Sequence, residues 1–126
     1  MLKEDYVSFE VAKLLKEIGF KGQEEHFYED NKITNFINYW KKITPEQRYE
    51  AIEAPTLQMA MKWLRDIHKW SIQVFPVFDN LKWCYDIYEL KKQKYHSRPD
   101  LMPNKDYDTY EDAAEAAIKI CLTNLI

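Results

Sequence analysis

The segment 71–90 constrains the fold more than any other part of the chain, because it specifies both a strand pairing and its register. Two runs rich in aromatic and β-branched residues flank Asp79-Asn80, and both of these residues tolerate the positive φ of a tight turn. With this turn, one face of the hairpin is entirely apolar. Its cross-strand pairs are Phe78–Leu81, Pro76–Trp83, Val74–Tyr85 and Ile72–Ile87. The opposite face is mixed, which predicts an antiparallel pair covered on one side, and a slip of one residue would invert the two faces.

Three other segments have apolar residues at the spacing of an amphipathic helix. They are 8–18, a segment from Pro55 or Thr56 to about His68, and 109–126. Ser8 and Thr109 are suitable N-caps, because a side-chain oxygen at that position accepts a hydrogen bond from the free amides of the first turn. Gly19 follows the first segment, at the place where a left-handed residue ends a helix.

Two segments between these helices have less regular patterns. Residues 24–40 are rich in aromatic and β-branched side chains, and Asp30-Asn31 divides them into two runs, so we expect a second hairpin there. The sequence Thr44-Pro45-Glu46-Gln47 has the cap, the first-turn proline and the capping-box glutamine of a helix start. This helix must be short, because Pro55 would remove a hydrogen bond from its interior.

Together these segments predict a single α+β domain over residues 1–126. We expect one antiparallel sheet of four to five strands with helices packed mainly on one face, in the order α-ββ-α(α)-ββ-α. A chain of 126 residues buries roughly two-thirds of its surface on folding, which is enough for one hydrophobic core. The residues expected in this core are Val11, Leu15, Ile18, Leu57, Ala60, Met61, Leu64, Ile72, Val74, Trp83, Ile87, Ala117, Cys121 and Leu122.

Composition argues against several classes of protein. The chain has 18 Lys and Arg residues against 21 Asp and Glu, so it lacks the overall positive charge of a typical nucleic-acid-binding domain. Cys84 and Cys121 each lie within an apolar pattern, and we expect both to be buried, reduced thiols. The N-terminal residues lack the apolar core of a signal peptide, and no run is long and apolar enough to cross a bilayer. These features predict a cytoplasmic protein.

No motif in the sequence predicts catalysis, a metal site or a cofactor. The histidines His26, His68 and His96 lie far apart and have no metal-binding spacing. With two glycines, the chain has no phosphate-binding or dinucleotide-binding loop motif. Cys84 lies in a predicted strand among aromatic residues, which favours a structural role over a catalytic one. The sequence therefore predicts a protein that is not an enzyme.

Residues 91–108 have no regular period, and we expect them to form a long connection without secondary structure. A basic run at its start surrounds a tyrosine, a combination that can hold phosphates and stack a base. The candidate contacts for an anion or a nucleic acid are Lys91, Lys92, Lys94, Tyr95 and Arg98. The alternative is a solvated loop that merely follows a strand.

The aromatic content, six Phe, four Trp and nine Tyr, exceeds what one helix-on-sheet core of this size needs. Five of these residues fall outside the predicted core positions, namely Tyr39, Trp40, Trp63, Trp70 and Tyr88. They predict either an exposed surface for a protein partner, since Trp and Tyr dominate interface anchors, or a second small core beneath residues 38–50.

Three segments resemble the helical signatures of a group of small proteins found in gut Bacteroidales and in their phages and mobile elements. The segments are YVSFEVAKLLKEIGF (6–20), APTLQMAMKWLR (54–65) and YDTYEDAAEAAIKICLTNLI (107–126), in the order of the family. The resemblance implies a phage or mobile-element setting, but the family brings no known activity, cofactor or catalytic residue. The stretch 91–108 is longer than the group leads us to expect.

The first expectation for function is a non-catalytic protein–protein interaction module, of which a homodimer is one form. A phage or mobile-element accessory role is what the resemblance implies. Two alternatives remain open. One is the binding of nucleic acid or another anionic ligand through residues 91–98, and the other is the binding of a small molecule in a pocket lined by aromatic side chains.

Overall fold

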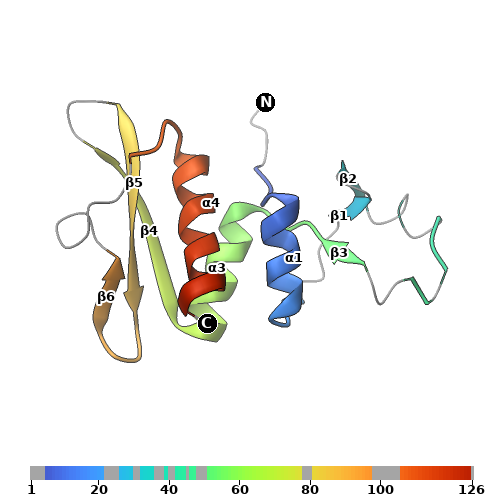
Figure 1. The fold of residues 1–126 in the computed structure, drawn as a ribbon, viewed down its shortest axis with the longest axis horizontal. Coiled ribbons are helices and arrows are strands. Elements are labelled where there is room, and N and C mark those ends of the chain that lie inside the picture. The colour runs from blue at the N-terminus through green and yellow to red at the C-terminus, as the bar shows by residue number, and fades with distance from the viewer. Residues whose placement is uncertain are drawn as a thin grey trace. The chain divides into compact units, whose positions relative to one another are not determined.

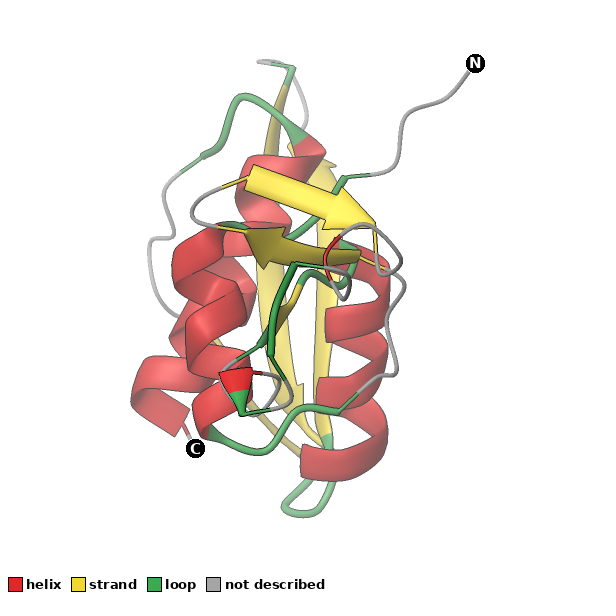
Figure 2. Cartoon of the chain, turned by 90° about the vertical axis from the view of Figure 1, so that its right-hand side faces the viewer, coloured by secondary structure: helices red, strands yellow, loops and turns green. Residues whose placement is uncertain are grey.

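The computed structural model describes residues 5–21, 26–29, 32–35, 39, 42–44, 46–47, 51–77, 81–97 and 106–125. The chain divides into two compact units, Met1–Thr56 and Leu57–Ile126. Helices and strands both occur in each unit, so the predicted α+β class is confirmed (Figure 2). The single domain expected from the length of the chain stays a prediction.

The helix of the first unit, α1 (Phe9–Glu17), begins and ends where the sequence predicts. The Ser8 hydroxyl accepts a hydrogen bond at 3.2 Å from the amide three residues later. At the other end Gly19 adopts a φ of 93°, and the Phe20 amide donates to the Leu15 carbonyl at 2.9 Å. This is the backbone geometry that a glycine after the last helical turn permits, and it leaves Phe20 buried.

The sheet of the first unit has three antiparallel strands in the order β2-β1-β3. The strands are β1 (His26–Glu29), β2 (Lys32–Asn35) and β3 (Ile52–Glu53). Strands β1 and β2 pair with Glu29 opposite Lys32, which leaves residues 30–31 as the connection. The hairpin expected around Asp30-Asn31 is therefore confirmed.

The capping box expected at Thr44 is present. The Gln47 amide donates to the Thr44 hydroxyl at 3.3 Å, and the Thr44 amide donates to the Gln47 side-chain oxygen at 2.8 Å. Residues 48–50 lie outside the described part of the chain, so the short helix expected after this box stays a prediction.

The sheet of the second unit is antiparallel, in the order β4-β5-β6 (Figure 1). Its strands are β4 (Trp70–Val77), β5 (Lys82–Glu89) and β6 (Lys94–Ser97). The observed pairs Ile72–Ile87, Val74–Tyr85 and Pro76–Trp83 are those that the sequence predicts, so the register is confirmed. Leu81, however, has a φ of 56° and belongs to the turn. The predicted pair Phe78–Leu81 would need Leu81 to be extended. Because Leu81 belongs to the turn instead, the connection between β4 and β5 is longer than two residues. Phe78 itself lies outside the described residues.

Two helices of the second unit lie on the same side of this sheet (Figure 1). They are α3 (Leu57–His68) and α4 (Tyr110–Ile120), and α4 continues as a π-helical turn, η2 (Cys121–Leu125). The Thr109 hydroxyl accepts from the Asp112 amide at 3.0 Å, as predicted for the N-cap of α4. The small side chains of Ala113, Ala114 and Ala117 are fully buried, which lets α4 pack closely.

Most of the predicted core is buried, and three of the four exceptions lie at the edge of a sheet or the end of a helix. The buried members are Val11, Leu15, Leu57, Ala60, Met61, Leu64, Ile87, Ala117, Cys121 and Leu122. Ile18, Ile72, Val74 and Trp83 are half-buried. Ile72 and Val74 lie on β4, the edge strand of its sheet, so they have a neighbouring strand on one side only. Ile18 is the C-cap residue of α1, at the end of the helix.

The prediction of one sheet of four to five strands is wrong. Among the described residues the strands form two sheets of three strands each. Side-chain alternation specifies which face of a strand is buried, whereas the backbone hydrogen bonds that join strands into one sheet have no signature in the side chains.

Within the described part of the chain, no helix has the length and the apolar composition needed to cross a membrane.

We expect Leu81→Gly to raise the free energy of unfolding by about 0.5–1 kcal/mol, because glycine adopts a positive φ without steric cost. Leu81 has a φ of 56° and its side chain is 93% exposed, so the substitution relieves strain and loses no burial. Unfolding in urea measures the change. Leu81→Ala is the control, since it removes most of the same exposed atoms but keeps a Cβ. An equal gain in both variants would contradict the explanation.

Candidate functional site

The basic segment after β5 forms a turn and strand β6 rather than an irregular connection. Strand β6 pairs with β5 with Tyr88 opposite Tyr95. The register then shifts by one residue, which leaves His96 as the extra residue of a β-bulge. The prediction that residues 91–108 lack secondary structure is therefore wrong for this part of the segment. The bulge interrupts the alternation of side chains, and the strand is short, so the sequence shows no strand period here.

Three lysines of the segment surround the end of the hairpin. Lys91 and Lys92 lie in the turn, and Lys94 is the first residue of β6. All three are exposed, and none forms an ion pair with another residue that the structure describes. Lys94 lies opposite Glu89 in the ladder, but the carboxylate of Glu89 is bonded elsewhere. Arg98, the remaining predicted contact, lies outside the described residues.

The tyrosine pair lies on the sheet face that α3 and α4 do not cover. Successive side chains of a strand point to opposite faces, and Ile87 is on the face that is buried beneath the helices, so Tyr88 is on the other. The rings of Tyr88 and Tyr95 meet edge to face, with centroids 4.9 Å apart and planes at 67°. Tyr95 is 40% exposed, which leaves much of its ring accessible. Asp86 is the acidic neighbour on this face, two residues farther from the turn.

Glu89, the acid closest to these lysines in the sequence, points away from the tyrosine pair. Glu89 is buried, and its carboxylate lies 2.7 Å from Nε2 of His96, the bulge residue. The His96 ring also meets the indole of Trp70 edge to face at 4.6 Å. Because Trp70 pairs with Glu89 across β4 and β5, these three side chains form one cluster on the helix side of the sheet. The cluster ties β6 to the rest of the sheet and keeps the Glu89 charge away from the uncovered face.

The predicted interface aromatics do not gather into one surface. Trp70 is buried at 8% exposure, so the expectation that it lies outside the core is wrong. If α3 continued through Trp70, this side chain would lie outside the apolar stripe of the helix. Lys69, however, has a φ of 64° and ends the helix. Trp70 therefore begins strand β4, where it lies on the same face as Ile72. Trp63 is half-buried on α3, against His68 at 4.8 Å.

The remaining aromatics of that set belong to other parts of the chain. Tyr39 lies in the first unit and stacks on Phe27, with centroids 5.5 Å apart and planes at 22°. Trp40 lies outside the described residues. Tyr88 is thus the member of the predicted set that joins the basic hairpin, and its partner there is Tyr95.

Both cysteines are buried and free, as the sequence predicts. Burial raises the pKa of Cys121 to about 12. Burial also raises the pKa of Cys84, with smaller contributions from the negative charges of Asp106 and Asp86. A thiol is nucleophilic as the thiolate, so neither cysteine is activated for nucleophilic catalysis at neutral pH. Within the described ranges, no three His, Cys, Asp or Glu side chains come together in a way that could hold a metal ion.

The sequence did not indicate the roles of Glu89 and His96. Glu89 precedes a turn and His96 follows it, so a hairpin centred on residues 91–92 would have brought the two strands together. The one-residue shift at the bulge then decides how the imidazole meets the carboxylate, and no local pattern marks that shift.

No family model, no curated protein and no solved structure matches this chain.

We expect His96→Ala to lower the free energy of unfolding by about 1–3 kcal/mol, because it leaves the buried Glu89 carboxyl group without its partner. It also removes the contact of His96 with Trp70. Urea unfolding followed by tryptophan fluorescence measures the loss. Lys92→Ala, in the exposed turn of the same hairpin, should change stability by less than about 0.5 kcal/mol. Similar losses in the two variants would show that the cluster does not anchor β6.

We expect the stability of the protein to fall as the pH rises above 9.0, the ordinary pKa of a cysteine thiol. Between pH 9.0 and the raised pKa of about 12, Cys121 loses its proton in the unfolded chain but keeps it in the folded one, so the unfolded state gains. The slope from this residue approaches about 1.4 kcal/mol per pH unit. The measurement is urea unfolding at several pH values, with Cys121→Ala as the control that lacks this slope. Parallel curves for the two proteins would contradict the assignment.

Proposed function

We propose that this protein is a non-catalytic binding module that holds single-stranded nucleic acid against the β5–β6 hairpin. One observation carries the proposal: an accessible tyrosine pair, Tyr88 and Tyr95, lies beside exposed lysines that have no ion-pair partner among the described residues. The carboxylate of Glu89, the residue that pairs with Lys94, is buried on the opposite face and held by His96.

The chemistry of the hairpin suits a single strand. Lys91, Lys92 and Lys94 can neutralise successive phosphates, which releases counterions and gives affinity that depends on salt. The exposed ring of Tyr95 can stack on a base, and Tyr88 supports it from the side. Bases of a single strand present their flat faces for this contact, whereas those of a duplex are stacked on one another. Stacking and phosphate contacts read no base edges, so we expect little sequence preference.

The protein–protein contact expected first from the sequence has less support from the geometry. The predicted interface aromatics lie on different elements, and Trp70 is buried. Both edges of the β4-β5-β6 sheet carry features that oppose pairing with another strand. Strand β4 contains Pro76, which has no amide to donate, and β6 is short, with Lys94 and the bulge at His96. An accessory role in phages or mobile elements agrees with nucleic acid binding, but it depends on the sequence resemblance alone.

We expect a fluorescein-labelled oligo(dT) of about 20 nucleotides to bind the protein at low salt, with affinity that falls steeply as salt is added. The combined variant Lys91→Gln, Lys92→Gln, Lys94→Gln should reduce the slope of log K against log salt by about 2, at roughly 0.7 per lost phosphate contact. Tyr95→Leu should weaken binding about tenfold through lost stacking and leave the slope unchanged. Fluorescence anisotropy measures both effects.

A charge-matched control separates this site from general electrostatic attraction. Lys13, Lys16 and Lys21 are exposed residues of the first unit, and their combined change to Gln alters the net charge equally. This control should keep the salt slope of the wild type. Equal losses in the two triple variants, or no binding of the oligonucleotide at low salt, would reject the proposal.

A further inference from the structure

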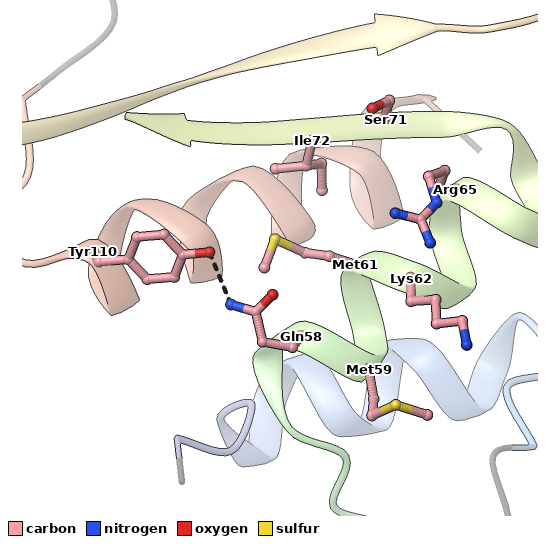
Figure 3. Close-up of a pocket in the computed structure, with 8 residues that line it drawn as sticks. All are labelled: Gln58, Met59, Met61, Lys62, Arg65, Ser71, Ile72 and Tyr110. Atoms are coloured by element: carbon pink, nitrogen blue, oxygen red, sulfur yellow. Dashed lines mark hydrogen bonds between the residues drawn. The ribbon is translucent and has the colours of Figure 1, made fainter. Parts of the chain in front are cut away.

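A groove of about 350 Å³ lies between α3 and the edge strand β4, on the helix side of the sheet (Figure 3). Its lining residues all belong to the second unit, from α3, the start of β4 and the first residue of α4. Sites for small ligands combine such a volume with an apolar surface and a few fixed polar groups. The groove has both. Its walls, α3 and β4, are consecutive along the chain, but Tyr110 comes from the distant α4, so no local sequence pattern predicts the site.

Arg65 forms one end of the groove. Its Nε donates to Oδ1 of Asp66 at 3.2 Å, which orients the guanidinium from its Nε side. The two terminal nitrogens are turned toward the space between α3 and β4 (Figure 3). These nitrogens form a planar fork that matches the two oxygens of a carboxylate. The side chain of Arg65 is 51% exposed, so an anion can reach it from solvent.

Gln58 and Tyr110 form the other end. The Gln58 amide donates to the Tyr110 hydroxyl at 2.8 Å (Figure 3). Because this hydroxyl accepts the bond from Gln58, its own proton remains available to a second acceptor. The Tyr110 ring is held in turn by the edge of Trp83, with centroids 5.6 Å apart. A ligand hydroxyl at this end could accept from Tyr110 and donate to the Gln58 side-chain oxygen.

The middle of the groove is apolar. Met61 and Ile72 lie between the two polar ends (Figure 3). Gln58 and Arg65 are two helical turns apart on α3, so the two ends are separated by about 10 Å. A linear ligand must therefore carry an anionic group at one end, an apolar chain of about that length, and a hydrogen-bonding group at the other end.

The charge of the groove favours a monoanion. Lys62 lines the groove, but its ammonium points away from β4 (Figure 3). Arg65 is thus the cation that faces the space, and Asp66 already balances part of its charge. A phosphate dianion would need more donors than this single fork supplies, whereas a carboxylate is matched by it.

We propose that this groove binds a linear aliphatic carboxylate with a hydroxyl group at its far end. The carboxylate lies on the Arg65 fork, the chain lies on Met61 and Ile72, and the hydroxyl bonds to Tyr110 and Gln58. This site lies on the helix side of the sheet and does not depend on the binding of nucleic acid at the hairpin.

The test uses two probes that differ by one hydroxyl, octanoate and 8-hydroxyoctanoate, followed by NMR chemical shifts of the intact ¹⁵N-labelled protein. Both should give saturable shifts at residues of the groove, with a dissociation constant on the order of 1 mM for 8-hydroxyoctanoate. The hydroxy acid should bind about threefold to tenfold more tightly than octanoate, for the added hydrogen bonds. Octan-1-ol, which has no carboxylate, should bind more weakly than either acid.

Two variants assign the ends of the ligand. Arg65→Gln should weaken both acids about tenfold, because a charge-assisted bidentate contact is lost. Tyr110→Phe should leave octanoate unchanged and remove the preference for the hydroxy acid. Lys119→Gln, an exposed charge change on α4, is the control and should bind as the wild type does.

Several results would overturn the proposal. They are the absence of saturable shifts with either acid, equal affinity for octan-1-ol and octanoate, and equal weakening by Arg65→Gln and Lys119→Gln. A hydroxy-acid preference that survives Tyr110→Phe would also overturn it. Because Tyr110→Phe keeps the ring and its contact with Trp83, it tests the site even if Arg65→Gln disturbs the fold.

Discussion

The register of the β4–β5 hairpin determines what each face of the second unit can do. With Ile72 opposite Ile87, the face that carries Ile72, Val74, Tyr85 and Ile87 is the one that α3 and α4 cover. The same alternation puts Tyr88 on the uncovered face, where it meets Tyr95. A shift of one residue would exchange the two sets, burying the tyrosine and exposing the core. The groove depends on the same register, because this register directs the Ile72 side chain toward α3, where it lines the groove.

The bulge at His96 is the second constraint, and it acts on a smaller scale. An extra residue in β6 lets the imidazole lie beside the Glu89 carboxylate and against the Trp70 indole. An acid within a few residues of three lysines would otherwise reduce their attraction for phosphate. Its burial on the helix side leaves Asp86 as the acidic neighbour of the tyrosine pair on the other face. The tyrosine pair and the groove therefore lie on different sides of one sheet, and the ligands that we propose for them differ in chemistry.

Local features of the structure were predictable, and features that join distant segments were not. The caps at Ser8 and Thr109 and the pairs of the β4–β5 hairpin follow from patterns within one element or across one turn. Trp70 was misplaced because the end of α3 depends on the positive φ of Lys69, a residue that favours no such backbone. Strand β6 was missed because a four-residue strand with a bulge has no readable period. The candidate contacts Lys91, Lys92, Lys94 and Tyr95 are predicted from a local basic run around a tyrosine, and their role stays a proposal.

By itself the sequence determined the α+β class, the ends of α1 and the start of α4, and the register of the long hairpin. These depend on turns, caps and alternation, which act between residues close together in the chain. Only the tertiary structure decided that the strands form two sheets, that Glu89 pairs with His96, and that Arg65 and Tyr110 lie at the two ends of one groove. These arrangements depend on which elements pack together, and the contacts between them leave no periodic mark on either segment.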